Sequence, residues 1–397
     1  MTTDKHNKRP NVPPLRFPEF TDEWETRKLS EFTERVTRKN KGQTNLPLTI
    51  SAQYGLVDQI SFFNNKVASA DMSNYYLLKK GEFTYNKSYS TDYPLGAIKR
   101  LDRYEMGALS TLYICFKING DIESDFLVHY FESPKWHRGV YEIAGEGARN
   151  HGLLNIAVGD FFETQHFRPK SIREQEKIAH FLTLIQHRIE VQSGLIEDLQ
   201  KLKAALVERL FCNKQGWKRY KYRDLLSPIS ERNSGNQFSN VLSASQELGM
   251  VSRTDLDIDI KFDRSAVTTY KIVRNGDYVL HLRSFQGGLA FSSMTGICSP
   301  AYTILRPKKE LEYGFFQEYF MSKSFINSLR LVTYGIRDGR SINVDEFLEM
   351  PVEIPDSDTQ CRIISILSIM NRRLRLAIKQ KENYIKQKQY LLQQMFI

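Results

Sequence analysis

Four short polar segments of the chain carry side chains that can donate or accept hydrogen bonds from exposed loops. The residues are Tyr85, Asn86, Lys87, Ser88, Tyr89, Arg149, Asn150 and His151 in the first half, and His281, Arg283, Ser284, Gln286, Arg337, Asp338 and Arg340 in the second. In the major groove of DNA, Arg and Lys pair with guanine and Asn and Gln with adenine, whereas phosphates accept from Lys, Ser and Tyr. We predict that these segments contact DNA, although any one residue could equally be a solvated loop residue.

The chain lacks the motifs of the common enzymes that act on nucleotides or nucleic acids. No GxxxxGK[ST] phosphate loop, no GxGxxG opening a helix, no HExxH and no Cys/His cluster with metal-ligand spacing occurs. The Glu-x-Lys triplet of magnesium-dependent nucleases and the Asp/Asn-Pro-Pro-aromatic motif of amino-methyltransferases are also missing. We therefore predict no catalytic residue and no metal site. The chain is predicted to bind and position a nucleic acid, while another protein carries out the reaction.

The composition is that of a globular protein with a basic balance. The 397 residues are 41% hydrophobic and 26% charged, with a net charge of +10. A basic balance favours a polyanionic partner because neutralised phosphates release counterions, although acidic substrates or membrane surfaces would fit the number too. The four cysteines are far apart and form no CxxC pair, which indicates reduced thiols and a cytoplasmic protein. We expect neither a secretory signal nor a membrane span.

The second half of the sequence repeats the landmarks of the first in the same order. Trp24 in "WETRKLSEF" matches Trp217 in "WKRYKYRDL", and "KKGEFTY" at 79–85 matches "VRNGDYVL" at 273–280. Further on, "GALSTLYICFK" matches "GICSPAYTILRPK". From Gln175 and Gln360 to Phe211 and Phe396 the shift stays at 185 residues without a gap. The chain is therefore predicted to be an internal duplication.

Each repeat is predicted to be a globular α/β (α+β) domain followed by a long helix. Short runs such as "STLYICFKI" and "PAYTILRP" are typical of strands, and "SDFLVHYFES" and "EYGFFQEYFMSKSFINSLRLV" of amphipathic helices. The predicted boundaries are 1–168 for the N-terminal arm and first domain, 169–212 for a central spacer helix, 213–354 for the second domain and 355–397 for a C-terminal spacer helix.

The two helices after Pro169 and Pro355 are predicted to pair antiparallel as a coiled coil about 60 Å long, relating the two domains by a pseudo-two-fold axis. A helix packed along a single domain is the alternative. The pairing residues are Ile185, Ile189, Ile196, Leu199, Leu206 and Leu210 in the first helix, and Ile363, Ile366, Met370, Leu374, Leu391 and Met395 in the second, whose less regular stripe also takes in Ile378 and Tyr384. Such a spacer would hold two DNA-reading domains at a fixed separation.

With these features together, the chain resembles the specificity subunit of a type I restriction–modification system. The resemblance rests on "VPPLRFPEFTDEWETRKLSEF" at 12–32, on "KKGEFTYNKSY" and "GALSTLYICF", and on the helical stretch at 168–211, all followed by their second copies. It implies a chain without catalytic activity or bound cofactor. It also implies a complex with two modification subunits that methylate adenine using S-adenosylmethionine, and with restriction subunits that use ATP and Mg.

We therefore predict a DNA-recognition subunit whose two domains each read half of an asymmetric, interrupted target. A stand-alone tandem DNA-binding protein, such as a regulator without enzyme partners, is the first alternative. A coiled-coil scaffold with two protein-binding heads is the second, and it would show no salt-dependent affinity for DNA. The clustered Arg372, Arg373, Arg375, Lys379 and Lys381 could be a solvated face, a surface for the modification subunits, or a DNA contact.

Overall fold

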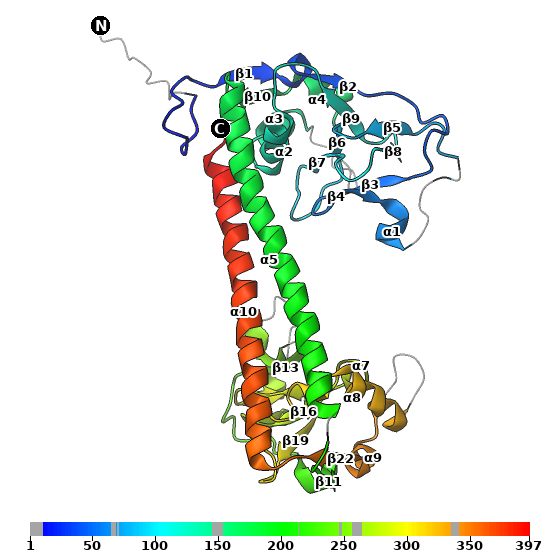
Figure 1. The fold of residues 1–397 in the computed structure, drawn as a ribbon, viewed down its shortest axis with the longest axis vertical. Coiled ribbons are helices and arrows are strands. Elements are labelled where there is room, and N and C mark those ends of the chain that lie inside the picture. The colour runs from blue at the N-terminus through cyan, green and yellow to red at the C-terminus, as the bar shows by residue number, and fades with distance from the viewer. Residues whose placement is uncertain are drawn as a thin grey trace. The chain divides into compact units, whose positions relative to one another are not determined.

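The chain forms two compact units in the computed structural model, which describes residues 11–64, 69, 71–144, 154–212, 214–245, 248–255, 264–334 and 341–397. Unit 1 comprises Met1–Gln192 with Gln380–Ile397, and unit 2 comprises Ser193–Lys379. Two long helices, α5 (Ile172–Cys212) and α10 (Ser357–Gln394), pass through both units (Figure 1). Each unit therefore consists of a globular part and one half of each helix.

The globular part of unit 1 is built on a four-stranded antiparallel sheet. Its elements are β1 Glu25–Lys28, η1 Leu29–Glu31, β2 Thr33–Arg35, β3 Leu48–Ser51, β4 Gly55–Asp58, α1 Gln59–Phe63, β5 Tyr76–Lys79, β6 Phe83–Asn86, β7 Ala97–Arg100, β8 Met106–Leu109, β9 Ile114–Ile118, α2 Ser124–Glu132, α3 His137–Ile143, α4 Val158–Glu163 and β10 Gln165–Arg168. The sheet order is β2-β9-β6-β7, and the two-stranded pairs are β1-β10, β3-β4 and β5-β8. In its centre Phe83 lies opposite Phe116, and their rings stack at 5.5 Å, which fixes the register of two adjacent strands.

The globular part of unit 2 is built in the same way. Its elements are β11 Lys218–Lys221, α6 Tyr222–Leu225, β12 Leu226–Ile229, β13 Leu242–Ser245, β14 Gly249–Ser252, η2 Arg253–Asp255, η3 Arg264–Thr269, β15 Lys271–Val273, β16 Tyr278–Leu280, α7 Ser284–Gly287, β17 Ala290–Phe291, β18 Gly296–Cys298, β19 Thr303–Pro307, η4 Tyr319–Met321, α8 Lys323–Ser328, η5 Leu329–Val332, β20 Thr333–Tyr334, β21 Ser341–Ile342, α9 Val344–Glu349 and β22 Pro351–Ile354. The sheet order is β12-β19-β16-β17, and the pairs are β11-β22, β13-β14, β15-β18 and β20-β21.

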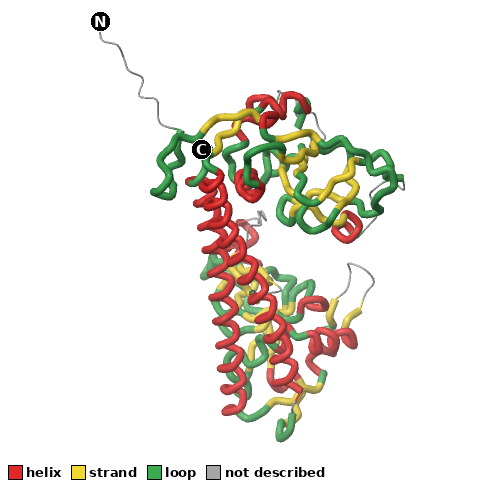
Figure 2. The backbone as a smooth tube through the Cα atoms, turned by 45° about the horizontal axis from the view of Figure 1, so that its top comes forward, coloured by secondary structure: helices red, strands yellow, loops and turns green. Residues whose placement is uncertain are grey.

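The two strand orders correspond one to one. Replacing β2, β9, β6 and β7 by β12, β19, β16 and β17 turns the first sheet into the second, and three of the strand pairs correspond likewise. Figure 2 shows the strands of each unit in its globular part. The mixed α/β fold and the internal repeat predicted from the sequence are thus present.

The long helices begin where a buried glutamine ties the chain to a proline carbonyl. Nε2 of Gln175 donates to the carbonyl oxygen of Pro169 at 2.9 Å, and its Oε1 accepts from the backbone of Glu123 at 2.8 Å. Gln360 makes the matching hydrogen bonds to Pro355 at 3.1 Å and from Glu312 at 2.9 Å. Because both glutamine side chains are almost fully buried, each one, hydrogen-bonded to the proline before it, anchors its helix to the preceding domain.

The two helices carry the same heptad seam at a shift of 185 residues. Among the less exposed positions, one series alternates three and four apart. It comprises 175, 178, 182, 185, 189, 192, 196, 199, 203, 206 and 210 in α5, and 360, 363, 367, 370, 374, 377, 381, 384, 388 and 391 in α10, with 395 just after its end. All predicted pairing residues except Ile366 lie on these seams.

The predicted stripe of the second helix was wrong at Ile366 and Ile378. Ile366 and Ile378 are 42% and 38% exposed, and Leu367 and Ala377, which are 4% and 7% exposed, hold the seam positions beside them. The stripe predicted from the sequence chose the larger isoleucines, each one position away from the seam residue. Only the burial of the side chains shows the true 3–4 spacing.

The predicted helix over 312–332 was also wrong. The chain there forms three short elements, η4, α8 and η5, and Gly314 has a φ of +79°. A residue in the left-handed conformation cannot continue an α-helix, and the chain after Gly314 buries its apolar side chains from separate short elements: Phe320 in η4, Phe325 in α8, and Leu329 and Val332 in η5. The rings of Phe320 and Phe325 have centroids 4.6 Å apart.

Each globular core is completed by the far end of a long helix. In unit 1, Leu391, Leu392, Met395 and Phe396 of α10 and the residues after it join the core cluster that contains Trp24 and Phe126. The ring of Phe396 lies 5.4 Å from that of Phe126. In unit 2, Val207 and Phe211 of α5 join the cluster around Tyr222 and Phe315. A domain and the helix that follows it are therefore not sufficient to build either core.

Candidate nucleic-acid interface

The first predicted DNA-binding segment leaves the edge of the central sheet in unit 1. β6 ends at Asn86, whose Oδ1 accepts from the backbone of Ser88 at 3.0 Å and so turns the chain. Lys87 is half-buried, and its Nζ lies 3.4 Å from the carbonyl oxygen of Ile156. Ser88 and Tyr89 are exposed, Tyr89 at 39%. The two residues past the turn are thus free to meet a ligand.

Tyr85 is a core residue, and its prediction as a DNA contact was wrong. Its side chain is fully buried, its ring stacks on Phe161 at 4.9 Å, and its hydroxyl donates to the carbonyl of Leu95 at 2.9 Å. Burial raises the pKa of the phenol far above its usual range. Both faces of β6 are packed, so Phe83, Thr84 and Tyr85 are all buried, which the residue type of Tyr85 alone did not reveal.

The corresponding segment of unit 2 follows β16 and forms the short helix α7. The backbone N–H of His281 donates to Oγ of Ser284 at 2.8 Å, and that of Arg283 donates to Nδ1 of His281 at 3.3 Å. Ser284 is fully buried and His281 is 8% exposed, so both hold the turn together. Their prediction as DNA contacts was therefore wrong. Arg283 and Gln286 are exposed.

The second predicted segment of each unit, with Arg149, Asn150, His151, Arg337, Asp338 and Arg340, lies outside the described residues. The chain next to each segment nevertheless meets the first loop of its unit. In unit 1 the backbone N–H of Leu154 donates to the carbonyl of Lys87 at 2.9 Å. In unit 2, β20 and β21 flank residues 335–340, and β21 lies against α7. In each unit, described residues that adjoin the second segment in sequence therefore contact the first segment.

The exposed side chains of the two loops differ in chemistry. Unit 1 offers Ser88 and Tyr89, which suit phosphates and stacking, whereas unit 2 offers Arg283 and Gln286, which suit bidentate hydrogen bonds to guanine and adenine. The same strand topology thus presents different exposed polar groups in the two units.

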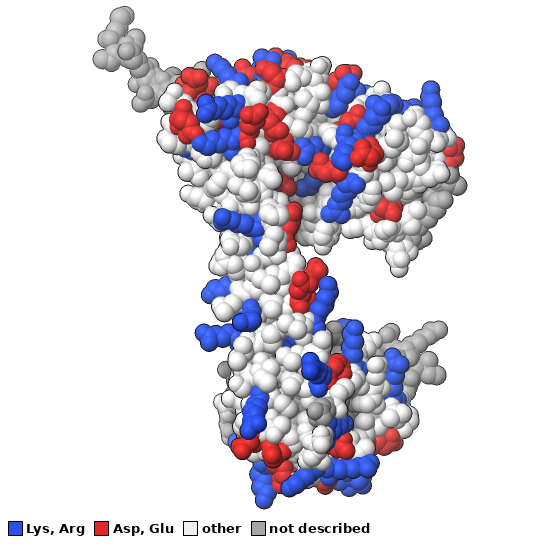
Figure 3. All heavy atoms as spheres, viewed as in Figure 1, with Lys and Arg blue, Asp and Glu red and all other residues white. Residues whose placement is uncertain are grey.

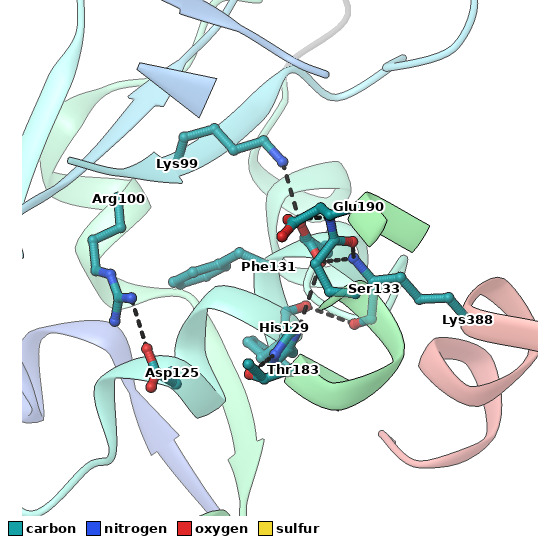
Figure 4. Close-up of polar contacts among 12 residues, drawn as sticks. Lys99, Arg100, Asp125, His129, Phe131, Ser133, Thr183, Glu190 and Lys388 are labelled. Atoms are coloured by element: carbon teal, nitrogen blue, oxygen red, sulfur yellow. Dashed lines mark hydrogen bonds and ion pairs between the residues drawn. The ribbon is translucent and has the colours of Figure 1, made fainter. Parts of the chain in front are cut away.

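A polar cluster joins the long helices to the domain in each unit, and the sequence gave no signal for its carboxylates. In unit 1, Lys388 of α10 and Lys99 of β7 approach the same place (Figure 4), where the carboxylate of Glu132 lies 2.7 Å from Lys388 and 3.6 Å from Lys99. In unit 2, Lys203 of α5 lies 2.6 Å from Glu318. Glu318 also accepts from Nδ2 of Asn371 in α10 at 2.6 Å. These contacts fix both helix halves against the domain that carries the loops.

A cluster of basic residues lies on α10 within unit 2. Arg372, Arg373, Arg375 and Lys379 are exposed, and none forms an ion pair with another described residue. By contrast, Figure 3 shows basic and acidic side chains intermingled over the visible face of unit 1. Unpaired, exposed arginines on a rigid helix form a suitable surface for an acidic partner or for phosphates.

Comparison with known proteins finds matches to the fold of the chain but not to its sequence. No protein-family model and no curated protein matches the sequence. Solved structures do match over nearly the whole chain. One chain of a structure describing complex assembly and conformational transition of the type I R-M system aligns with a TM-score of 0.59 at 14% identity, over 96% of this chain and 98% of that chain. The S subunit of a type I restriction–modification system from M. genitalium aligns with a TM-score of 0.53 at 13% identity, over 97% and 99%.

The chain has the S-subunit fold of type I restriction–modification systems. This fold provides two domains with exposed loops and two long helices that close both domain cores. Within the described residues of this S-subunit fold, no group of three or more His, Cys, Asp or Glu side chains is placed to hold a metal ion. No helix among those residues is long and apolar enough to cross a membrane. Cys115 and Cys298 are buried thiols, and Cys212 and Cys361 are exposed thiols.

Proposed function

We propose that this chain is the DNA-recognition subunit of a type I restriction–modification complex and has no catalytic role itself. The observation that carries the proposal is the repeated topology with different loop chemistry: one strand order, two sets of exposed polar side chains. Two related readers in one chain suit an asymmetric target made of two half-sites separated by a gap. Unit 1 would read one half-site and unit 2 the other.

The proposed partners are double-stranded DNA, two modification subunits and the restriction subunits. Because the exposed arginines of α10 are unpaired and lie on a helix rather than a loop, we assign them to a contact with the modification subunits. S-adenosylmethionine, ATP and Mg would be bound by those partners and not by this chain. The complex would act in the cytoplasm, where its DNA lies.

Long-read mapping of adenine methylation in the host genome tests this proposal. The map is compared between strains with the gene intact, deleted and restored. We expect an interrupted, asymmetric motif to disappear on deletion and return on restoration. A matched chimaera that carries a different globular part in unit 2, with both long helices unchanged, should alter only one half of the motif.

Two results would contradict the proposal. One is an unchanged methylation map in a strain whose modification subunit is active. The other is a chimaera that changes both half-sites at once. A purified chain that binds DNA with a steep salt dependence but leaves the methylation map unchanged would favour the stand-alone DNA-binding protein.

A further inference from the structure

The N-terminal arm of unit 1, residues 11–23, is held on the long helices by a buried ion pair. Nε and Nη2 of Arg16 donate to the two carboxylate oxygens of Glu174 at 2.7 and 2.8 Å. The same carboxylate accepts from the indole N–H of Trp24 at 3.1 Å. Glu174 is 2% exposed, so the arm supplies the charge without which this carboxylate would be buried unpaired.

Apolar and charged contacts hold the rest of the arm. The ring of Phe17 lies edge-on to Phe181 of α5 at 5.8 Å, and the ammonium of Lys177 lies 4.5 Å from the same ring. Lys177 also pairs with Glu19 of the arm. The backbone N–H of Leu15 donates to the carbonyl of Gln394 of α10 at 2.9 Å. The arm thus covers the place where the start of α5 meets the end of α10.

The matching place in unit 2 is an open groove. The chain passes from Cys212, the last residue of α5, to Trp217 through four residues, so no arm precedes Trp217 as one precedes Trp24. A groove of about 420 Å³ remains between the end of α5 and the start of α10. It is lined by Leu206, Arg209, Leu210, Trp217, Thr359, Arg362, Ile363 and Ile366.

The groove corresponds, in the second repeat, to the site where the arm binds the long helices in unit 1, but its charge differs. At a shift of 185, Ile363 and Ile366 stand for Ile178 and Phe181, so the apolar floor is kept. Thr359 stands for Glu174, which removes the partner of Arg16, while Arg362 stands for Lys177 and Arg209 for Gln394. Neither arginine forms an ion pair with another described residue. The site has therefore lost one negative charge and gained one positive charge.

We propose that this groove binds an extended segment of a partner protein in which an aromatic residue is flanked by carboxylates. The aromatic ring would take the position of Phe17 against Ile366, and the carboxylates would meet Arg209 and Arg362 as Glu19 meets Lys177. The arm of a second copy of this chain does not fit, because its Arg16 would face two arginines and a threonine. The partner segment binds only to unit 2, since the arm of the chain itself fills the site in unit 1.

Two fluorescent peptides test the groove on the full-length chain, assembled with its partners where these are needed for solubility. One is NVPPLRFPEFTDE, residues 11–23, and the other is the same peptide with Arg16→Glu. We expect the R16E peptide to bind about tenfold more tightly, a preference that shrinks as salt rises because both arginines are exposed. Ile366→Asp should abolish binding, whereas Ile369→Asp, an exposed change one turn away on α10, should not.

A charge exchange provides the decisive control. Thr359→Glu restores the carboxylate of the unit 1 site and should reverse the preference towards the peptide that carries Arg16. Equal binding of both peptides, binding of an acidic peptide with a scrambled sequence, or insensitivity to Ile366→Asp would overturn the proposal. Tighter binding of the unchanged arm peptide would instead indicate arm exchange between copies of the chain. None of these outcomes depends on DNA recognition.

Discussion

The ammonium group of Lys388, near the end of the chain, lies 2.7 Å from the carboxylate of Glu132, 256 residues earlier in the sequence. Lys388 also donates to Oε1 of Gln186 in α5 at 2.8 Å. Burial alone would raise the pKa of Glu132, but contact with His129 and the ammonium groups of Lys388 and Lys99 hold that pKa well below its usual range. One polar group thus links α10, α5 and the domain of unit 1.

Replacing Lys388 by Met should lower the free energy of unfolding by about 1–3 kcal/mol. The change leaves Glu132 with the longer contacts to Lys99 and His129, and the cost is below that of a fully buried pair because the two side chains are 13% and 24% exposed. Urea denaturation followed by circular dichroism would measure it. Lys386→Met, on the exposed side of the same helix, should change the midpoint little. Equal effects of the two variants would contradict this assignment.

His166 should make unit 1 less stable in mild acid. The ring is 2% exposed, and burial lowers its pKa from 6.5 to about 4. Below pH 6.5 the unfolded chain therefore binds a proton that the folded chain does not, so stability falls as pH drops from 6.5 towards 4. The loss at pH 5 is about 2 kcal/mol relative to pH 7.

The measurement for His166 is the unfolding midpoint between pH 5 and 7.5. His166→Gln should flatten this dependence, because a neutral amide can still bond to Tyr130 and Thr164, which lie 3.0 and 2.8 Å from the ring nitrogens. His180→Gln, an exposed change on α5, serves as the control and should leave the slope intact. An unchanged slope in His166→Gln would show that another group is responsible.

Gln175 should be intolerant of change although it is not among the predicted DNA-contact residues. Gln175→Ala removes hydrogen bonds to Pro169 and from Glu123 and leaves a buried carbonyl and a buried N–H without partners, at a cost of about 2–4 kcal/mol. Gln360→Ala should act in the same way on unit 2. Hydrogen exchange at the first turns of α5 and α10 would show which helix start each variant loosens. If exchange rose equally at both helix starts in either variant, the prediction would be contradicted.

The exposed loop residues of unit 2 should contribute to affinity for DNA but not to the stability of the folded chain. Arg283→Ala and Gln286→Ala should each weaken binding to a cognate DNA duplex by about 1–3 kcal/mol, with the loss confined to one half-site. Arg219→Ala, an exposed basic change on β11, is the matched control. Ser284→Ala is expected to lower stability instead, since its hydroxyl holds the turn. An equal loss for cognate and unrelated DNA would indicate phosphate contacts in place of base readout.

The loops of unit 1 allow the complementary comparison. Tyr89→Ala should weaken DNA binding while leaving the unfolding midpoint unchanged, because Tyr89 is 39% exposed. Tyr85→Ala should instead destabilise unit 1 by about 3–5 kcal/mol, as expected for an aromatic side chain removed from a packed core. Retention of full stability by Tyr85→Ala would contradict the burial described here.

The sequence by itself determined the duplication, the two long helices and the mixed α/β class. These features follow from local chemistry repeated at a fixed interval: apolar spacing, prolines that begin helices, and strands rich in β-branched and aromatic residues. The runs "STLYICFKI" and "PAYTILRP" contain β9 and β19 as predicted, and the constant shift of 185 residues aligned the two seams. Along the second long helix, residue type misled where a large side chain lies beside the seam, as Ile366 lies beside Leu367.

Only the tertiary structure decided which polar residues are free and which parts of the chain complete each other. Tyr85 and Tyr89 are the same residue type four positions apart, yet one packs against Phe161 and the other is exposed, because β6 ends at Asn86 and Tyr89 lies beyond the turn that follows. Lys388 meets Glu132, and Phe396 meets Phe126, through contacts whose partners are more than two hundred residues apart in sequence. Such pairings depend on the packing of distant elements, which local spacing does not encode.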